Sequence, residues 1–155
     1  MKTISALCIL SIAVGCLSSA SESNPEKIIP VEQPVEDGIQ FFHGSWEEAL
    51  KKAEDEKKMI FLDAYAAWCG PCKMMAATSF KDKAVGEYFN ENFINFKMDM
   101  EKDGNGPRLS AKFSVIAYPT LYFVDNEEVI IHTTMGMKDA AQLIEFGKTA
   151  ITKKG

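Results

Sequence analysis

The feature that most constrains the fold is a pair of cysteines placed directly after a strand-like segment. Residues 58–65 read KMIFLDAY, a mostly apolar run whose length is typical of a buried central strand. Trp68-Cys-Gly-Pro-Cys72 follows, and residues 71–80 are predicted to be helical. Proline is favoured in the first turn of a helix, because its missing N–H would have no partner there. The sequence therefore predicts a strand, a tight turn, and a helix that carries both cysteines at its start.

This placement suits thiol chemistry, because the thiolate is the form that attacks disulfides. Cys69 is expected at the N-terminus of the helix, where unpaired N–H groups and the helix dipole favour an anion. Two intervening residues bring Cys72 within disulfide distance of Cys69. Cys72 is expected to be more buried and to keep its proton. We therefore expect Cys69 to attack, Cys72 to resolve, and the two to form a redox disulfide.

The remaining segments predict an α/β domain. Ser45 and Glu48 form a capping box for a helix that ends near Glu56. The other expected elements are a short strand over 40–42, a helix from Asp82 through Phe89, a strand over 93–99, a short helix with Leu109 and Phe113, strands over 120–124 and 128–132, and a last helix after Asp139. This order predicts a central mixed sheet flanked by helices, with parallel strands and an antiparallel hairpin.

Composition and charge narrow the class of protein. The chain has 155 residues, of which 46% are hydrophobic and 25% are charged, which fits one globular domain. It carries 22 acidic against 17 basic residues, for a net charge of −5, and Arg108 is its single arginine. A chain with this excess of acidic residues is not expected to bind nucleic acid, because its net charge repels the phosphates.

The N-terminal residues predict export. Residues 1–20 combine Lys2, an uncharged apolar stretch and small residues, which is the layout of a secretory signal. Two cleavage sites remain open. One lies after Ala20, and the other lies before Cys16, which resembles a bacterial lipobox cysteine and would anchor the chain to a membrane through lipid. Both predict an extracytoplasmic location, the bacterial periplasm. Residues 21–38 hold three prolines and five acidic residues and predict a flexible linker before a domain over 39–155.

The chain from about Phe41 to the C-terminus resembles the thioredoxin family. Asp63 lies six residues before Cys69, where the family has a buried carboxylate, and Pro119 stands where it has a cis-proline that faces the active site. Gly136 matches the glycine of the family's substrate groove. Residues 72–80, with Asp82, Val85 and Phe93 behind them, are most similar to the branch that includes the C-terminal domain of the membrane thiol–disulfide interchange protein.

The resemblance implies a thioredoxin fold and a protein-disulfide reductase without a cofactor. Its substrates would be disulfide-containing exported proteins, and a membrane electron donor would restore its dithiol. The Cys-Gly-Pro-Cys sequence resembles reducing members, whereas oxidants more often carry histidine between the cysteines. The implied catalytic residues are Cys69, Cys72, Asp63 and Pro119, and the implied groove residues are Trp68, Gly70, Pro71, Tyr118, Thr120 and Gly136. Asp63 is expected to be desolvated, to have a raised pKa, and to accept the proton of Cys72.

Four departures from the family pattern bear on these expectations. Ala77 stands in place of a proline that kinks the helix, which predicts a straighter helix. Asn95 stands in place of a lysine near the buried carboxylate. Tyr118 precedes Pro119 instead of isoleucine. About six residues are added around 101–106, which could shape a partner surface.

The same residues allow alternative interpretations. Half of a zinc site is disfavoured because zinc takes four ligands and no second cysteine pair follows the leader, so no metal is predicted. Asp63 could be structural, and Trp68 could belong to the core instead of forming a wall that faces substrate. At the level of function, two alternatives remain: a disulfide oxidase or isomerase, and a thioredoxin-fold binding module.

Overall fold

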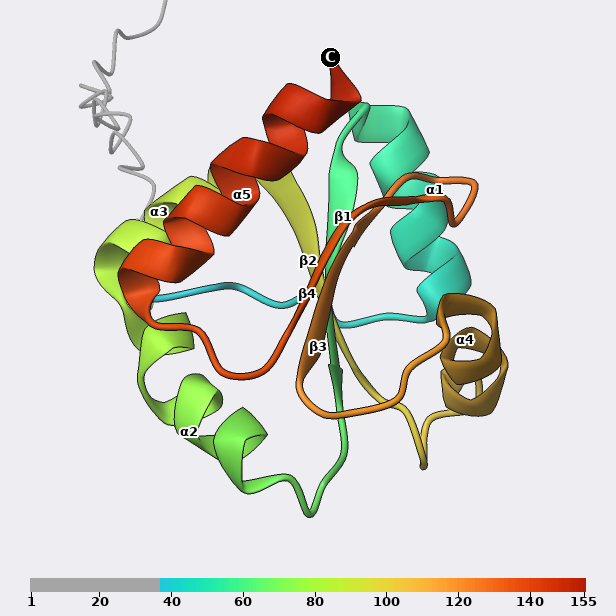
Figure 1. Ribbon diagram of the computed structural model, residues 1–155. Helices are drawn as coiled ribbons and strands as arrows, with labels where there is room; N and C mark the ends of the chain where they lie inside the picture. The colour runs from blue at the N-terminus through green and yellow to red at the C-terminus, as the bar shows by residue number, and fades with distance from the viewer. Residues whose placement is uncertain (1–36) are drawn as a thin grey trace, which may run out of the picture. The chain divides into compact units, whose positions relative to one another are not determined.

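A four-stranded mixed sheet organises residues 37–155, the part of the chain that the computed structural model describes (Figure 1). Its strands are β1 (Met59–Tyr65), β2 (Phe93–Asp99), β3 (Thr120–Val124) and β4 (Ile130–Met135), in the spatial order β2-β1-β3-β4. β1 pairs in parallel with β2 and antiparallel with β3, which pairs antiparallel with β4. The mixed sheet predicted from the sequence is therefore confirmed. The expected leader, and all but the last two residues of the expected linker, lie outside the described residues.

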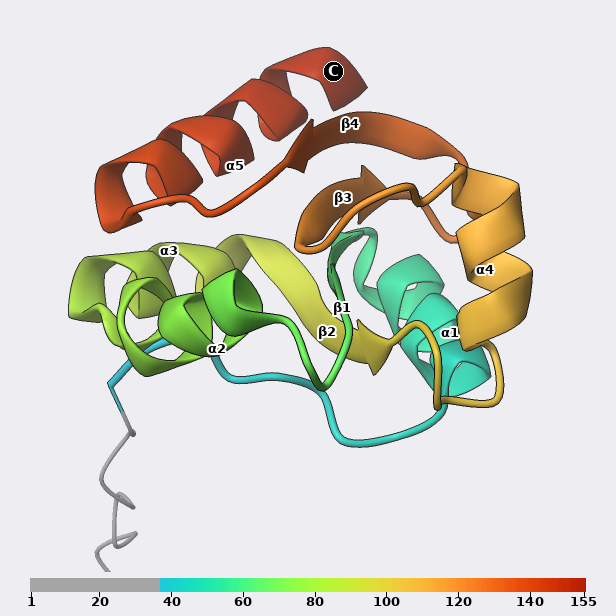
Figure 2. The ribbon, with the colours of Figure 1, turned by 60° about the horizontal axis from the view of Figure 1, so that its bottom comes forward.

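Helices cover both faces of the sheet (Figures 1 and 2). One face carries α1 (Trp46–Glu56) and α4 (Gly106–Phe113), and the other carries α2 (Gly70–Ala77), α3 (Lys83–Asn92) and α5 (Ala140–Lys154). Successive strand side chains point to opposite faces. Leu62 of β1 thus packs in the core beneath α1 and α4, whereas Phe61 packs among the aromatic rings beneath α3 and α5. β1 is buried on both sides, as its apolar sequence predicts. None of the helices over residues 37–155 is long and apolar enough to span a membrane.

Helix starts follow the side-chain signals in the sequence. The Ser45 hydroxyl accepts from the Glu48 amide at 3.1 Å, and the Glu48 carboxylate accepts from the Ser45 amide at 2.7 Å. This confirms the predicted capping box. Asp139 and Gln142 form a second capping box at the start of α5.

The helix that carries the cysteines is shorter than predicted. α2 ends at Ala77, Thr78 leaves the helical region with φ −124° and ψ −85°, and a 3₁₀ turn over Ser79–Lys81 follows. The Thr78 hydroxyl donates to the Met74 carbonyl at 2.8 Å, and the Ser79 hydroxyl donates to the Lys138 carbonyl at 2.7 Å. Hydroxyl side chains of this kind compete with the helix for backbone partners. The prediction that one helix extends over residues 71–80 is therefore wrong in its extent.

Two strand predictions also need correction. Residues 40–42 form no regular strand: the Phe42 amide donates to the Asn95 carbonyl at 2.7 Å, but the Gln40 amide donates to the Asn90 side chain, so no ladder develops along β2. In the hairpin, β4 begins at Ile130, not at residue 128, and continues to Met135. The Asp125 carboxylate accepts the amides of Glu127 and Val129 and so stabilises a longer turn.

Glu128, in that turn, joins three elements. Its carboxylate accepts the Trp46 indole N–H at 2.6 Å, two N–H groups of Arg108 at 2.6 and 2.9 Å, and the Lys112 ammonium at 2.6 Å. Hydrogen bonds from Arg108 above all, together with those from Lys112 and Trp46, lower the pKa of Glu128 to about 2. The carboxylate thereby ties α1 and α4 to the β3–β4 turn.

Candidate active site

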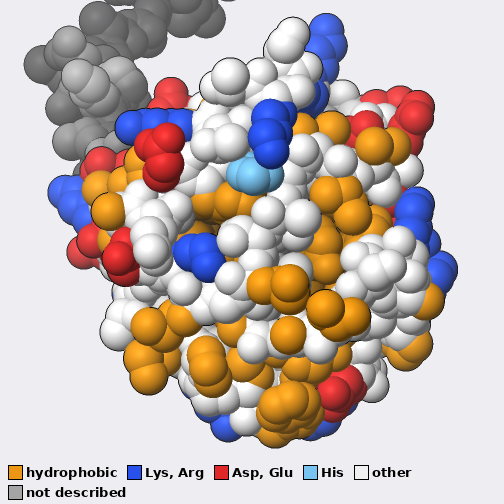
Figure 3. Space-filling model, in the orientation of Figure 1, with side chains coloured by type: hydrophobic (Ala, Val, Ile, Leu, Met, Phe, Trp, Pro, Cys, Tyr) orange, Lys and Arg blue, Asp and Glu red, His pale blue; other side chains and the backbone are white. Residues whose placement is uncertain are grey.

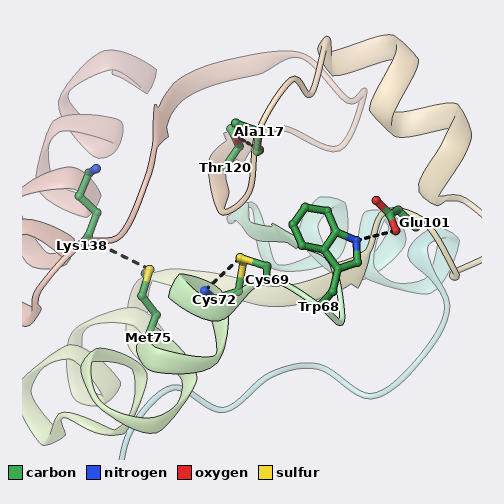
Figure 4. The surroundings of a disulfide bond; sticks show 8 residues. All are labelled: Trp68, Cys69, Cys72, Met75, Glu101, Ala117, Thr120 and Lys138. Atoms are coloured by element: carbon green, nitrogen blue, oxygen red, sulfur yellow. Dashed lines mark hydrogen bonds between the residues drawn. A yellow bond between two sulfur atoms is a disulfide. The ribbon is translucent and has the colours of Figure 1, made fainter.

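Cys69 and Cys72 are joined by a disulfide at the start of α2 (Figure 4). Cys69 is the N-cap residue, and its sulfur accepts the amide N–H of Cys72 at 3.1 Å. Gly70 and Pro71 are exposed on the first turn between them, and a Cβ at Gly70 would meet no atom within 4 Å. When the disulfide is reduced, the N-cap sulfur is the one that unpaired helix amides and the helix dipole stabilise as an anion.

The two cysteines differ in their hydrogen bonding more than in their burial. Cys69 is 2% exposed and Cys72 is 6% exposed, so the expectation that Cys72 is the more buried residue is wrong. Ala66 packs beside both cysteines, and Tyr65 and Tyr118 contact the same cluster. Because this cluster covers Cys69 as well, the distinction between the two sulfurs rests on the amide that Cys69 accepts.

Asp63 is a buried carboxylic acid on β1. It is 2% exposed, and within residues 37–155 its Oδ1 atom has no hydrogen-bond partner. Burial raises the pKa of Asp63 to about 7, and the positive charge of Lys97 partly offsets this effect. Asp63 can therefore take up or release a proton near neutral pH. A carboxylate satisfied by the backbone, the structural alternative, does not describe this side chain.

Lys97 is a residue of this site that the sequence analysis missed. It is the β2 partner of Asp63, and its ammonium lies 4.8 Å from the ring centroid of Tyr65 and 5.4 Å from that of Phe41. The assignment of Asn95 to the position of the family lysine is wrong, because Asn95 pairs with Phe61 and donates to Asn90. Both positions share one face of β2, so the period of two alone could not choose between them.

Trp68 forms an exposed wall beside the disulfide. Its side chain is 68% exposed, so the core interpretation is wrong. The indole packs edge-on against Tyr118, with ring centroids 5.7 Å apart, and its N–H donates to Glu101 Oε2 at 2.9 Å (Figure 4). Glu101, in the loop between β2 and α4, is the second residue of this site that the sequence analysis did not single out.

The turn before β3 also faces the disulfide, because Tyr118 packs in the cluster around the two cysteines. The Tyr118–Pro119 peptide bond is cis. The Thr120 hydroxyl donates to the Ala117 carbonyl at 2.7 Å, and the amide of Gly136, which has φ +79°, donates to the Pro119 carbonyl at 2.8 Å. The expected groove residues thus come from three segments: the start of α2, the turn before β3, and the end of β4.

Apolar side chains surround this end of the molecule. Hydrophobic surface gathers in the lower part of Figure 3, where Figure 1 places the start of α2 and the turn before β3. Exposed large apolar residues on these segments and on the end of β4 are Trp68, Met74, Ile116, Met135 and Met137. Exposed apolar surface of this kind favours contact with another polypeptide. Among residues 37–155, no group of three or more His, Cys, Asp or Glu side chains could hold a metal ion.

A dithiol at a helix N-terminus, with a buried acid on the adjoining strand, defines the site of a thiol–disulfide oxidoreductase. The chain belongs to the thioredoxin family, whose sequence profile matches residues 39–149.

Comparisons with individual proteins agree with this assignment. Thioredoxin H-type 2 of Nicotiana tabacum is 31% identical over 98 residues, which cover 63% of this chain and 77% of that protein. The solution structure of a candidate disulphide-isomerase from Bacteroides thetaiotaomicron is 43% identical, with a TM-score of 0.67, and the match covers 77% of this chain and 98% of that chain. The oxidised C-terminal domain of DsbD from Neisseria meningitidis has the same fold, at 22% identity and a TM-score of 0.58, over 72% of this chain and 99% of that domain.

Proposed function

We propose that this chain is an extracytoplasmic reductase of disulfides in exported proteins. The observation that carries the proposal is the disulfide at the start of α2, in which the Cys69 sulfur accepts the Cys72 amide. In the reduced protein the same amide stabilises a Cys69 thiolate, the species that attacks a disulfide. The apolar surface around it suits a polypeptide substrate.

The reaction has two exchange steps. The Cys69 thiolate attacks one sulfur of the substrate disulfide, a mixed disulfide forms, and the other substrate sulfur leaves as a thiolate. Cys72 then loses its proton and attacks the Cys69 sulfur, which forms the Cys69–Cys72 disulfide and releases the second substrate thiolate. Two electrons have passed from the protein to the substrate. Asp63, with a pKa of about 7, accepts the Cys72 proton in the second step.

The direction and the location rest on sequence features. The Gly-Pro pair between the cysteines is similar to that of reducing family members, and residues 1–20 have the layout of an export signal. Outside the cytoplasm, the dithiol would need a membrane protein as its electron donor. Cell fractionation and the mass of the mature N-terminus test the location. A lipidated Cys16 or a free Ser21 is expected, and an intact Met1 in the cytoplasm would contradict it.

The test of the reaction is reduction of an exported disulfide protein by the full chain, with Cys69→Ser as the inactive control. Equilibration with glutathione buffers then gives the reduction potential. A potential near that of thioredoxin is expected, whereas one near the strong oxidant DsbA, some 150 mV higher, would refute the assignment as a reductase. An intact dithiol without any turnover would instead favour a binding module.

A second candidate function, disulfide isomerisation, is favoured by one comparison. The Bacteroides thetaiotaomicron chain at 43% identity is described as a candidate disulphide-isomerase and is covered over 98% of its length. An isomerase rearranges wrong disulfides and needs no net supply of electrons. Recovery of activity from scrambled ribonuclease, without added reductant beyond a catalytic amount, would support this second function over the first.

A further inference from the structure

Glu101 stands out among the charged residues near the disulfide, because it holds an exposed aromatic ring in place. An indole that is 68% exposed has freedom to rotate, yet the Trp68 N–H is bound to Glu101 and its ring is packed against Tyr118. Burial raises the pKa of Tyr118, and the negative charge of Glu101 raises it further. One carboxylate therefore acts on both aromatic residues of the wall.

Hydrogen bonds hold the backbone around Glu101 in place. Its amide donates to the Asp99 carboxylate at 3.1 Å, the Asp99 amide donates to the Asp103 carboxylate at 2.7 Å, and the next amide, that of Met100, donates to the Tyr65 carbonyl at 2.8 Å. Tyr65 belongs to the cluster around the cysteines. The loop thus fixes Glu101 relative to the disulfide, as a residue that orients another side chain must be fixed.

The charge of Glu101 is also available to a partner. A carboxylate offers about four acceptor positions, so one indole N–H leaves most of them open to solvent. By contrast, the ammonium of Lys138, on the opposite side of the disulfide in Figure 4, already donates to the carbonyls of Met135 and Gly136. Glu101 thus places negative charge on the Trp68 side of the disulfide, whereas Lys138 lies on the opposite side and Lys73 is exposed on the first turn of α2.

We propose that Glu101 is a positioning and specificity-determining residue of this site. It holds the Trp68 indole against Tyr118 as one wall of the groove, and it favours disulfide substrates that carry a basic residue beside the reacting cysteine. This inference rests on the proposed thiol–disulfide exchange activity. A single charge pair exposed to water changes affinity by up to about fivefold, and the effect weakens with salt.

The test uses three cyclic disulfide peptides that differ only in a lysine, glutamine or glutamate beside one cysteine. For the wild-type full chain, kcat/KM is expected to fall in that order, and Glu101→Gln is expected to lower the lysine-to-glutamate ratio by about three- to fivefold. Glu54→Gln, which removes an equal charge from the exposed surface of α1, is the matched control and is expected to keep the ratio.

The role of Glu101 in positioning Trp68 is tested by a separate NMR measurement, which does not require catalytic turnover. In Glu101→Ala the indole N–H resonance of Trp68, assigned with Trp68→Phe, is expected to move upfield, while that of Trp46, which donates to Glu128, stays in place and reports an intact fold. An unchanged peptide ratio in Glu101→Gln, or an unmoved Trp68 resonance in Glu101→Ala, overturns the proposal. Failure of the wild-type chain to process any of the three peptides would refute the proposed activity instead, and the resonance would still decide the positioning role.

Discussion

Replacing Asp63 with asparagine is expected to stabilise the oxidised protein in a manner that depends on pH. In the folded chain burial raises the pKa of Asp63 to about 7 from an ordinary value of 3.8. Below pH 3.8 the acid is mostly protonated in both the folded and the unfolded state, so its titration makes no contribution to the free energy of unfolding. As the pH rises from 3.8 to 7 the unfolded chain ionises while the folded chain keeps its proton, and the free energy of unfolding falls. Above pH 7 the cost is constant.

The magnitude follows from the difference between the two pKa values. At 1.36 kcal/mol per pKa unit, the cost of burying this acid approaches about 4 kcal/mol at pH 8 to 9. Asparagine has no such titration. Its buried amide brings its own penalty of about 1–3 kcal/mol, but that penalty is the same at every pH. The gain of Asp63→Asn over wild type is therefore expected to grow by about 4 kcal/mol between pH 4 and pH 9.

Urea unfolding of the oxidised protein at a series of pH values measures this gain. In thermal unfolding at the same pH values, the difference in melting temperature between Asp63→Asn and wild type is expected to change by on the order of 15 °C between pH 4 and pH 9. Asp55→Asn is the matched control, because Asp55 is exposed on α1 and pairs with Lys51, an arrangement worth less than about 1 kcal/mol at any pH. An equal gain for Asp63→Asn at pH 4 and at pH 9 would refute the reasoning.

Three further predictions concern the site and the fold. Cys69→Ser is expected to abolish disulfide reduction, whereas Cys72→Ser attacks once and accumulates a mixed disulfide visible by mass spectrometry; turnover by the first variant would contradict the assigned roles. In single-turnover experiments the resolution rate of the wild type is expected to rise as the pH passes about 7, and Asp63→Asn is expected to resolve slowly without that inflection. Glu128→Gln is expected to lose about 1–2 kcal/mol of stability at pH 7, less than its full pKa shift implies because Arg108 and Lys112 are half exposed. As the pH falls below 4.5, Glu128 becomes protonated in the unfolded chain, and it becomes protonated in the folded chain only near pH 2, so the loss of stability is expected to shrink over this range. An equal loss at pH 2 and at pH 7 would count against the ion pairs.

Local signals in the sequence predicted most of the fold. The apolar run that became β1, the capping box at Ser45 and the cap at Asp139 each act within a few residues, so their effects are visible in the sequence alone. The end of α2 depended instead on where the Thr78 and Ser79 hydroxyls find partners, and one of these is the distant carbonyl of Lys138. No helical pattern records such a contact.

The site shows the same division between local and distant determinants. The cysteines and Asp63 were found because a strand, a turn and a helix start fix them relative to one another over ten residues. Lys97 was missed because its relation to Asp63 depends on the register between β1 and β2, which the 33 intervening residues do not reveal. The contact between Glu101 and Trp68, over a similar separation, was hidden for the same reason.

The closeness of the two cysteines along the chain affects how much the stability of the protein differs between its oxidised and reduced forms. A cross-link lowers the entropy of the unfolded chain by an amount that grows with the logarithm of the number of residues in the loop that it closes. The loop from Cys69 to Cys72 contains four residues. On that account the bond adds only about 2 kcal/mol to the free energy of unfolding. The packed cores on both faces of the sheet are independent of it. Oxidised and reduced chains are thus both expected to remain folded, so that each round of electron transfer is a local event at one end of a persistent scaffold.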